Sequence, residues 1–150
     1  MTNIDHLGFW KPKVGKSFKR LSDICLKKKE DGGKGFSKKE VENLTEQSKS
    51  ILRRCVHPDL KDNIRTGLII GKIQSGKTLS FSSLSCLAKD NNIRVIIILS
   101  GTKINLFDQT KDRIKEDIVG THTRTWRAFT AKQINPKESE NIRRLLDEDN

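Results

Sequence analysis

Residues 68–78 have the sequence LIIGKIQSGKT, and this stretch decides the fold that we expect for the chain. A short apolar run is followed by a loop that contains Gly71 and Gly76 and ends in Lys77 and Thr78. The eight residues of this loop fit G-x-x-x-x-G-K-[ST], the P-loop pattern of nucleotide-binding proteins. The pattern is informative because each fixed position has a mechanical role.

The glycines of the loop permit backbone geometry that other residues avoid, so successive N–H groups can turn toward a phosphate. A helix that starts at the end of the loop adds the positive end of its dipole. Lys77 is the catalytic candidate, because its ammonium group would reach the β- and γ-phosphates of ATP, and the Thr78 hydroxyl would bind Mg²⁺. The predicted nucleotide-binding residues are Gly71, Gln74, Ser75, Gly76, Lys77, Thr78 and Leu79.

The segments that flank the loop predict an α/β fold. Residues 68–70 and 93–99 are apolar runs rich in β-branched side chains, which are typical of strands buried on both faces of a parallel sheet. Residues 77–89 have the length of a helix, with Phe81, Leu84 and Ala88 on one side and small serines that would let it lie close to a sheet. Strand, loop, helix and strand would form a βαβ unit.

The chain after the second apolar run continues this pattern. Residues 104–118 form an amphipathic helix with Phe107, Ile114 and Ile118 facing inward. Residues 120–130 are strand-like but polar, and Pro136 opens a last helix through Leu146, because proline is favoured in a first helical turn. We expect residues 64–150 to form the P-loop core.

Residues 1–63 are predicted to form a basic, mainly helical region. Phe18, Leu21 and Cys25 share one face of a first helix that ends in three lysines. A second helix starts with the capping box Ser37-x-x-Glu40 and ends before Pro58. Its apolar stripe has spacings of three and four and consists of Val41, Leu44, Ser48, Ile51, Leu52 and Cys55. The tripeptide Gly15-Lys16-Ser17 repeats the end of a P-loop, but it lacks the upstream glycine and strand.

Composition excludes several classes of protein. The net charge is +11, and residues 1–65 hold 16 basic and 9 acidic side chains, an excess that favours polyanions such as nucleic acid. Three dispersed cysteines fit neither a disulfide framework nor a zinc site, and three isolated histidines have no ligand spacing. No apolar run is long enough to span a membrane, and a signal peptide is lacking, so we expect a cytoplasmic protein.

The sequence LSGTKINLFDQT at residues 99–110 resembles motif Ia of superfamily 2 helicases, in which a strand ends in P-T-R-x-L-x-x-Q. Thr102, Lys103, Leu106 and Gln109 match in type, whereas Gly101 replaces the proline and one extra residue precedes Leu106. In that family the loop contacts the nucleic-acid backbone. The resemblance therefore implies nucleic-acid contacts by Gly101, Thr102, Lys103 and Asn105.

Residues 64–118 together resemble the helicase-like ATPases called the Z-one family, whose loop has the sequence G-x-V-Q-S-G-K-T. These proteins accompany endonucleases in bacterial and phage defence or modification systems. The resemblance implies an incomplete RecA-like parallel sheet and an ATPase that acts on nucleic acid, with DNA expected in preference to RNA. An endonuclease subunit or domain is the implied protein partner.

A helicase-type ATPase also needs an acidic pair after a buried strand and an arginine finger. Asp147-Glu148 is an acidic pair, but an amphipathic helix precedes it, so it is a poor candidate for the Mg²⁺ ligand. We therefore expect the chain to be the N-terminal piece of a longer protein, and to bind nucleotide better than it hydrolyses it.

Two other functions fit parts of the sequence. A P-loop kinase or GTPase would have the loop, but a GTPase also needs a guanine-reading motif such as N-K-x-D, which the chain lacks. A non-enzymatic, basic DNA-binding fragment would have the charge and a vestigial loop. Binding of DNA that is indifferent to nucleotide and to Lys77 would favour the fragment.

Overall fold

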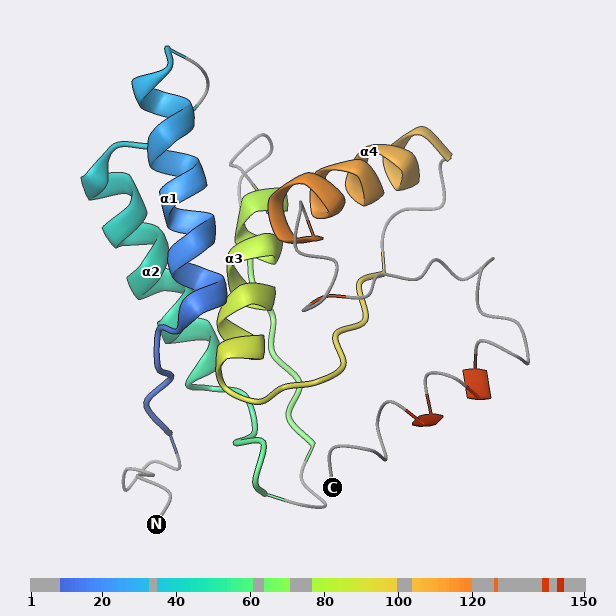
Figure 1. The fold of residues 1–150 in the computed structure, drawn as a ribbon. Helices are drawn as coiled ribbons and strands as arrows, with labels where there is room; N and C mark the ends of the chain where they lie inside the picture. Colours follow the sequence, from blue (N-terminus) through green and yellow to red (C-terminus); the bar gives the residue numbers. More distant parts are fainter. Residues whose placement is uncertain are drawn as a thin grey trace. The chain divides into compact units, whose positions relative to one another are not determined.

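The computed structural model describes residues 9–32, 35–60, 64–70, 77–99, 104–119, 126, 139–140 and 143–144. Their α-helices are α1 (Lys16–Glu30), α2 (Lys38–Leu52), α3 (Lys77–Asp90) and α4 (Ile104–Ile114), and the π-helical turn η1 (Lys115–Val119) continues α4 (Figure 1). The chain divides into two compact units, Met1–Ile118 and Val119–Asn150. The α-helices all belong to the first unit.

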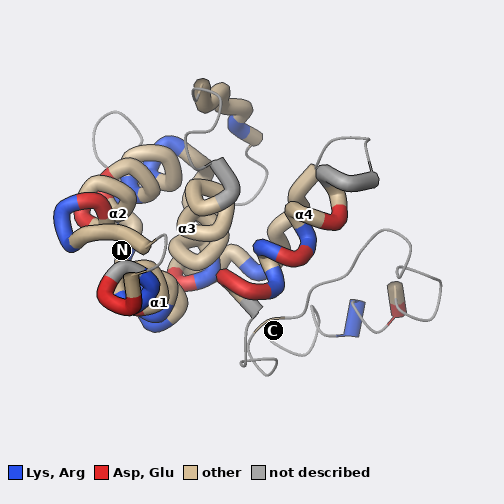
Figure 2. Tube along the Cα trace, turned by 90° about the horizontal axis from the view of Figure 1, so that it is seen from above, with Lys and Arg blue, Asp and Glu red and all other residues tan. Residues whose placement is uncertain are grey.

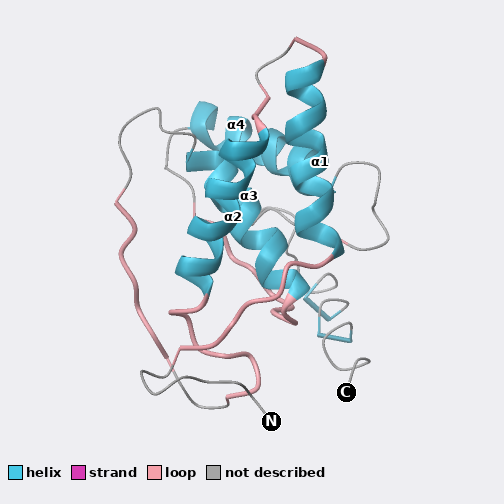
Figure 3. Ribbon diagram, turned by 90° about the vertical axis from the view of Figure 1, so that its left-hand side faces the viewer, coloured by secondary structure: helices cyan, strands magenta, loops and turns pink. Residues whose placement is uncertain are grey.

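The predicted parallel sheet is wrong for the part of the chain that the structure describes. Residues 64–70 and 93–99 are extended but belong to no strand, and Figure 3 shows only helices and loops there. Leu68 and Ile70 are 85% and 87% exposed, and Ile97 and Leu99 are 79% and 91% exposed. The structure is therefore helical where an α/β fold was expected.

The physical reason for this error lies in what a strand requires. A strand is stable only when a neighbour accepts its backbone hydrogen bonds and another layer covers its side chains. The apolar β-branched runs predict the local extended conformation, and the backbone adopts it. Neither run has a strand partner within the described residues, so the runs form no sheet.

Helix α1 confirms the face predicted for it. Phe18, Leu21 and Cys25 are all buried, at the predicted helical spacing. The first turn of α1 carries no acidic residue, and its N-cap position is occupied by Gly15, which has no side chain to accept a hydrogen bond. The free N–H groups of this first turn must therefore find their acceptor elsewhere.

The acceptor is Asp90, the last residue of α3. Its carboxylate accepts hydrogen bonds from the backbone N–H groups of Gly15, Ser17 and Phe18, each at 2.9 Å. A Cβ on Gly15 would lie 2.7 Å from Cγ of Asp90, so only glycine permits this approach. Asp90 thus serves as the cap of a helix more than 70 residues away in sequence, and its negative charge complements the positive helix end.

The chain leaves α3 by a Schellman motif that holds Asp90 in place. The N–H of Ile93 donates to the carbonyl of Ala88, and the N–H of Asn92 donates to the carbonyl of Lys89. Asn92 has φ of 64°, a left-handed conformation that asparagine tolerates better than most residues. Asn91 bonds both backbone groups of Lys13, at 2.8 and 2.9 Å. The end of α3 is therefore tied to the chain segment that enters α1.

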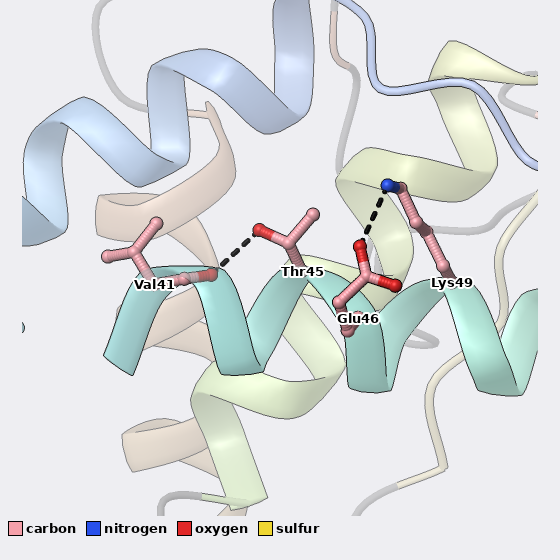
Figure 4. A network of polar contacts seen from close by, with 4 residues as sticks. All are labelled: Val41, Thr45, Glu46 and Lys49. Carbon is pink, nitrogen blue, oxygen red and sulfur yellow. Dashed lines mark hydrogen bonds and ion pairs between the residues drawn. The ribbon is translucent and has the colours of Figure 1, made fainter. Parts of the chain in front are cut away.

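Helix α2 confirms the predicted capping box. The Ser37 hydroxyl accepts from the N–H of Glu40, and the Glu40 carboxylate accepts from the N–H of Ser37 at 2.8 Å. Figure 4 shows two further bonds along α2: Thr45 donates to the carbonyl of Val41 at 2.7 Å, and Lys49 pairs with Glu46 at 3.0 Å. The helix ends at Leu52, before Pro58 as predicted.

The core lies where α1, α2 and α3 pack against one another. The serines of α3 allow a close approach, as predicted, but to helices instead of a sheet: Ser82, Ser83 and Ser85 are buried, whereas Phe81 is 47% exposed. The Ser83 hydroxyl donates to the Ser80 carbonyl and lies 3.0 Å from the Ser48 hydroxyl of α2. A hydroxyl has one proton, so Ser48 is the donor of the bond between α2 and α3.

Helix α4 packs against α3, and its predicted extent is confirmed except that the last turn is a π-helix. Ile118 is buried as expected. The π-helical turn places Asp117 3.4 Å from the Ser82 hydroxyl and 3.7 Å from the Lys28 ammonium group. One carboxylate therefore connects α1, α3 and η1.

The division of the chain at residues 63 and 64 stays a prediction, and helices from both sides of it pack together. The polar strand predicted over residues 120–130 lies outside the described residues except for Trp126. Most of the last predicted helix also lies outside them, and its described residues, 139–140 and 143–144, are helical and exposed.

Replacing Asp90 by alanine should destabilise the protein, because three N–H groups of α1 lose a charged acceptor. We expect a loss of about 1–3 kcal/mol in the free energy of unfolding, measured by urea denaturation. The control is Asp23→Ala, on the exposed side of α1, which should change stability by less than about 0.5 kcal/mol. Equal effects of the two substitutions would show that the bonds to Asp90 do not stabilise α1.

Candidate functional site

The predicted P-loop leads directly into α3. Gly71, Gln74, Ser75 and Gly76 lie outside the described residues, and Lys77 and Thr78 are the first two residues of α3. The side chains of Lys77 and Thr78 are also outside what the structure describes. Leu79 follows them on α3 and is half-buried. Helix α3 thus begins at Lys77, the seventh residue of the motif.

This junction suits an anion because of the helix that follows it. The first N–H groups of an α-helix have no partner within the helix and lie at the positive end of its dipole. Helix α3 is 14 residues long, and its interior is packed through Ser82, Ser83, Cys86 and Leu87, all of which are buried. Its far end is fixed by Asp90 and Asn91. The start of α3 is therefore presented on a rigid element.

The tripeptide Gly15-Lys16-Ser17, which matches only the end of a P-loop, already binds an anionic group within the protein. The backbone N–H groups of Gly15 and Ser17 donate to the two carboxylate oxygens of Asp90. The segment therefore does recognise an anion, as a glycine turn before a helix should. The anion is a side chain of the same protein, which satisfies the groups that a phosphate would need.

The predicted nucleic-acid contacts fall just before α4. Gly101, Thr102 and Lys103 lie outside the described residues, and Asn105 is in the first turn of α4 with its side chain outside the description. Gln109, the other motif residue on α4, is exposed. Helix α4 starts at Ile104, so the predicted contact loop precedes a helix as expected.

The described residues offer no cluster of side chains that could bind a metal ion. They contain no group of three or more His, Cys, Asp or Glu side chains that could hold one. Asp117 is engaged by Ser82 and Lys28, and Asp147 and Glu148 lie outside the described residues. Within this part of the chain, the predicted Mg²⁺ ligand is still Thr78 alone.

The cysteines have a structural character. Cys25 and Cys86 are buried, and Cys55 is exposed. Burial raises the pKa of the Cys86 thiol to about 12, and the negative charge of Asp90 adds to this effect. Burial also raises the pKa of Cys25, with a further contribution from Asp117. Both buried thiols stay protonated, and the protonated form is not the reactive one.

An apolar hollow of about 380 Å³ lies between α3 and the extended segment 93–99. Its walls include Leu52 of α2 and Phe81, Leu84 and Ala88 of α3. From Val95 to Leu99 the side chains alternate between exposed and half-buried, as expected for an extended chain with one side toward a helix. This segment leads from the end of α3 toward the predicted contact loop.

Sequence reasoning missed a group of cationic side chains beside the end of α2. The guanidinium carbons of Arg53 and Arg54 lie 5.3 and 5.7 Å from the centre of the Phe9 ring. Arg65 donates to the carbonyl of Arg54 at 3.3 Å. The available signal was the adjacent pair Arg53-Arg54 near the end of the apolar stripe, which the sequence analysis did not use.

None of the helices among the described residues is both long and apolar enough to cross a membrane. Comparisons of the chain with known protein families, with curated proteins and with solved structures give no match.

The three cysteines should differ sharply in reactivity toward a thiol reagent. Titration with DTNB at pH 8 should modify Cys55 in the folded protein, because its side chain is exposed whereas those of Cys25 and Cys86 are buried. Unfolding with guanidinium should release the other two. Cys55→Ser is the control and should abolish the fast reaction. Rapid modification of that variant under native conditions would contradict the burial of Cys25 and Cys86.

Proposed function

We propose that the chain binds ATP with Mg²⁺ through residues 71–79. The observation that carries the proposal is the start of α3 at Lys77, the seventh residue of a complete G-x-x-x-x-G-K-[ST] pattern at residues 71–78. Backbone N–H groups of the loop and of the first turn of α3 would surround the phosphates. Lys77 would contact the β- and γ-phosphates, and Thr78 would hold the ion that bridges them.

Two features of the helix support this assignment over a plain glycine turn. The buried serine face and the bonds at Asp90 fix α3 along its length, so little freedom is lost when the loop closes on a ligand. Gly15-Lys16-Ser17 supplies the contrast within the same chain: there a turn of similar composition is already satisfied by Asp90. At residues 71–78 the pattern is complete, and we propose that its N–H groups bind the phosphates of a nucleotide.

The wider proposal is an ATPase that depends on nucleic acid and resembles the helicase-like family described above. It would act on DNA in preference to RNA, with an endonuclease as a partner and the cytoplasm as its location. Support comes from the net charge of +11 and from the residues that resemble motif Ia. The parallel sheet that the resemblance implies is absent from the described residues, so this proposal rests on the charge and the motifs alone.

A second candidate is a DNA-binding fragment without enzymatic activity. It is favoured by the group of arginines beside α2, which is folded and exposed irrespective of the loop. In this case the chain would bind DNA, and its loop would bind no nucleotide.

Lys77→Ala should weaken the binding of ATP about 10- to 100-fold, because the loop loses one charge-assisted contact with the phosphates. The measurement is isothermal titration calorimetry of the full chain with ATP in the presence of Mg²⁺, repeated with EDTA. Wild type should bind more tightly with Mg²⁺, and hydrolysis should be slow relative to binding.

The matched control for this experiment is Lys16→Ala, the same substitution within the Gly15-Lys16-Ser17 tripeptide. It removes the same charge and should leave the affinity for ATP unchanged. Equal affinities of Lys77→Ala and wild type would overturn the proposal. Tighter binding of GTP than ATP would favour the GTPase alternative.

A further inference from the structure

We propose that the arginine cluster, which consists of Phe9, Arg53, Arg54, His57 and Arg65, is a binding site for single-stranded DNA. This site is separate from residues 71–79 and from the predicted contacts at residues 101–105. It extends the nucleic-acid part of the proposed function and does not depend on the binding of ATP.

The cluster brings together three parts of the chain. Phe9 precedes α1, Arg53 and Arg54 directly follow α2, and Arg65 lies in the extended segment before the loop. The guanidinium groups of Arg53 and Arg54 lie over the Phe9 ring, and Arg65 is joined to the same corner by its bond to the Arg54 carbonyl. All three arginines are exposed, so their outer faces are accessible to a ligand.

The backbone beneath the cluster is fixed. Trp10 is buried, and its indole N–H donates to the carbonyl of Cys55 at 3.0 Å. The Trp10 ring meets the ring of His57 edge-on, with 4.9 Å between the centroids. The side chain of Arg54 also donates to Ser50 of α2. The arginines are thus attached to a packed corner of the protein, which lowers the entropy lost when they bind.

The cluster differs from the exposed side of α2, which carries both lysine and glutamate (Figure 2). At the end of α2, in contrast, Arg53 and Arg54 are adjacent and Arg65 joins them. Helix α1 is also basic, with six basic and two acidic residues, so its lysines serve as the control for overall charge. Among the described residues, the carboxylate of Asp59 lies 3.6 Å from the imidazole of His57. The cluster therefore presents a local positive field to a polyanion.

A stabilising role at the helix end accounts for only part of the arrangement. Arginine near a helix C-terminus interacts favourably with the dipole, and Arg54 does so through the Ser50 carbonyl. Arg65 comes from a different segment, and Arg53 lies over an aromatic ring. Helix capping requires neither of these contacts.

The chemistry of the cluster favours single-stranded nucleic acid over an acidic peptide. Guanidinium groups bind phosphate in bidentate fashion and also stack on base faces. Aromatic side chains stack on base faces as well. In a single strand both the phosphates and the base faces are accessible. A duplex hides its base faces and would use only the phosphate contacts, so we expect it to bind more weakly.

The test is fluorescence anisotropy of a labelled single-stranded 15-mer with the full chain at several salt concentrations. The triple variant Arg53→Gln, Arg54→Gln and Arg65→Gln should lower the affinity at least tenfold. The slope of log affinity against log salt should fall by about 2, since each phosphate contact in a single strand contributes about 0.7. The matched control replaces the exposed lysines Lys16, Lys19 and Lys27 of α1 by glutamine and should lower the affinity less than threefold.

A conservative variant keeps the proposal testable if the glutamine variant does not fold, as judged by circular dichroism. Replacement of the same three arginines by lysine preserves the charge and removes the planar guanidinium groups. It should lower the affinity severalfold with little change in the salt slope. In a Trp126→Phe background, Trp10 is the remaining tryptophan, and saturating DNA should quench its emission.

Several results would overturn the proposal. Equal losses for the arginine and the α1 lysine variants would show that only overall charge matters. Equal affinity for a polyglutamate peptide, or unchanged Trp10 emission at saturation, would place DNA elsewhere or assign the cluster to another partner. If wild type binds no DNA, the nucleic-acid part of the proposed function also fails. The titration of Lys77→Ala with ATP decides nucleotide binding independently.

Discussion

The junction between α1 and α3 depends on one carboxylate. Asp90 ends α3 and caps α1, so the position of each helix is defined by a bond to the other. The requirement extends to Gly15, because any side chain there would collide with Asp90. It also extends to Asn92, whose left-handed backbone turns the chain at the point where Asp90 can face α1. Gly15, Asp90 and Asn92 thus constrain one junction, which fixes the C-terminal end of α3 to the start of α1.

The local elements could be predicted from the sequence because their signals are local. The capping box of Ser37 and Glu40 and the spacing of Phe18, Leu21 and Cys25 need no information beyond one helix. Local signals of this kind could not show whether the two apolar runs form a sheet, and the described residues form none. Residues 93–99 have the composition of a buried strand, but pairing is a property of two segments, and composition does not show whether a second strand lies beside the first.

The candidate site was predictable to a similar extent. The start of α3 at Lys77 follows from the loop pattern, whereas the capping of α1 by Asp90 and the approach of Arg65 to Arg54 are long-range contacts without a sequence signature. The small serines of α3 were interpreted correctly as a sign of close packing. The predicted packing partner, a sheet, was wrong, because small residues on a helix allow close packing against helices as well as against a sheet.

The contact between Ser48 and Ser83 makes the N-terminal region more than an arm attached to α3. The hydroxyls of these residues satisfy each other in the interior, where neither has access to water. If residues 1–63 were removed, α3 would expose a polar, small-residue face that cannot bury itself and an Asp90 with no helix to cap. The order of α3 therefore depends on residues 1–63. Any shift of α1 or α2 would be passed mechanically to α3, the helix that begins at Lys77.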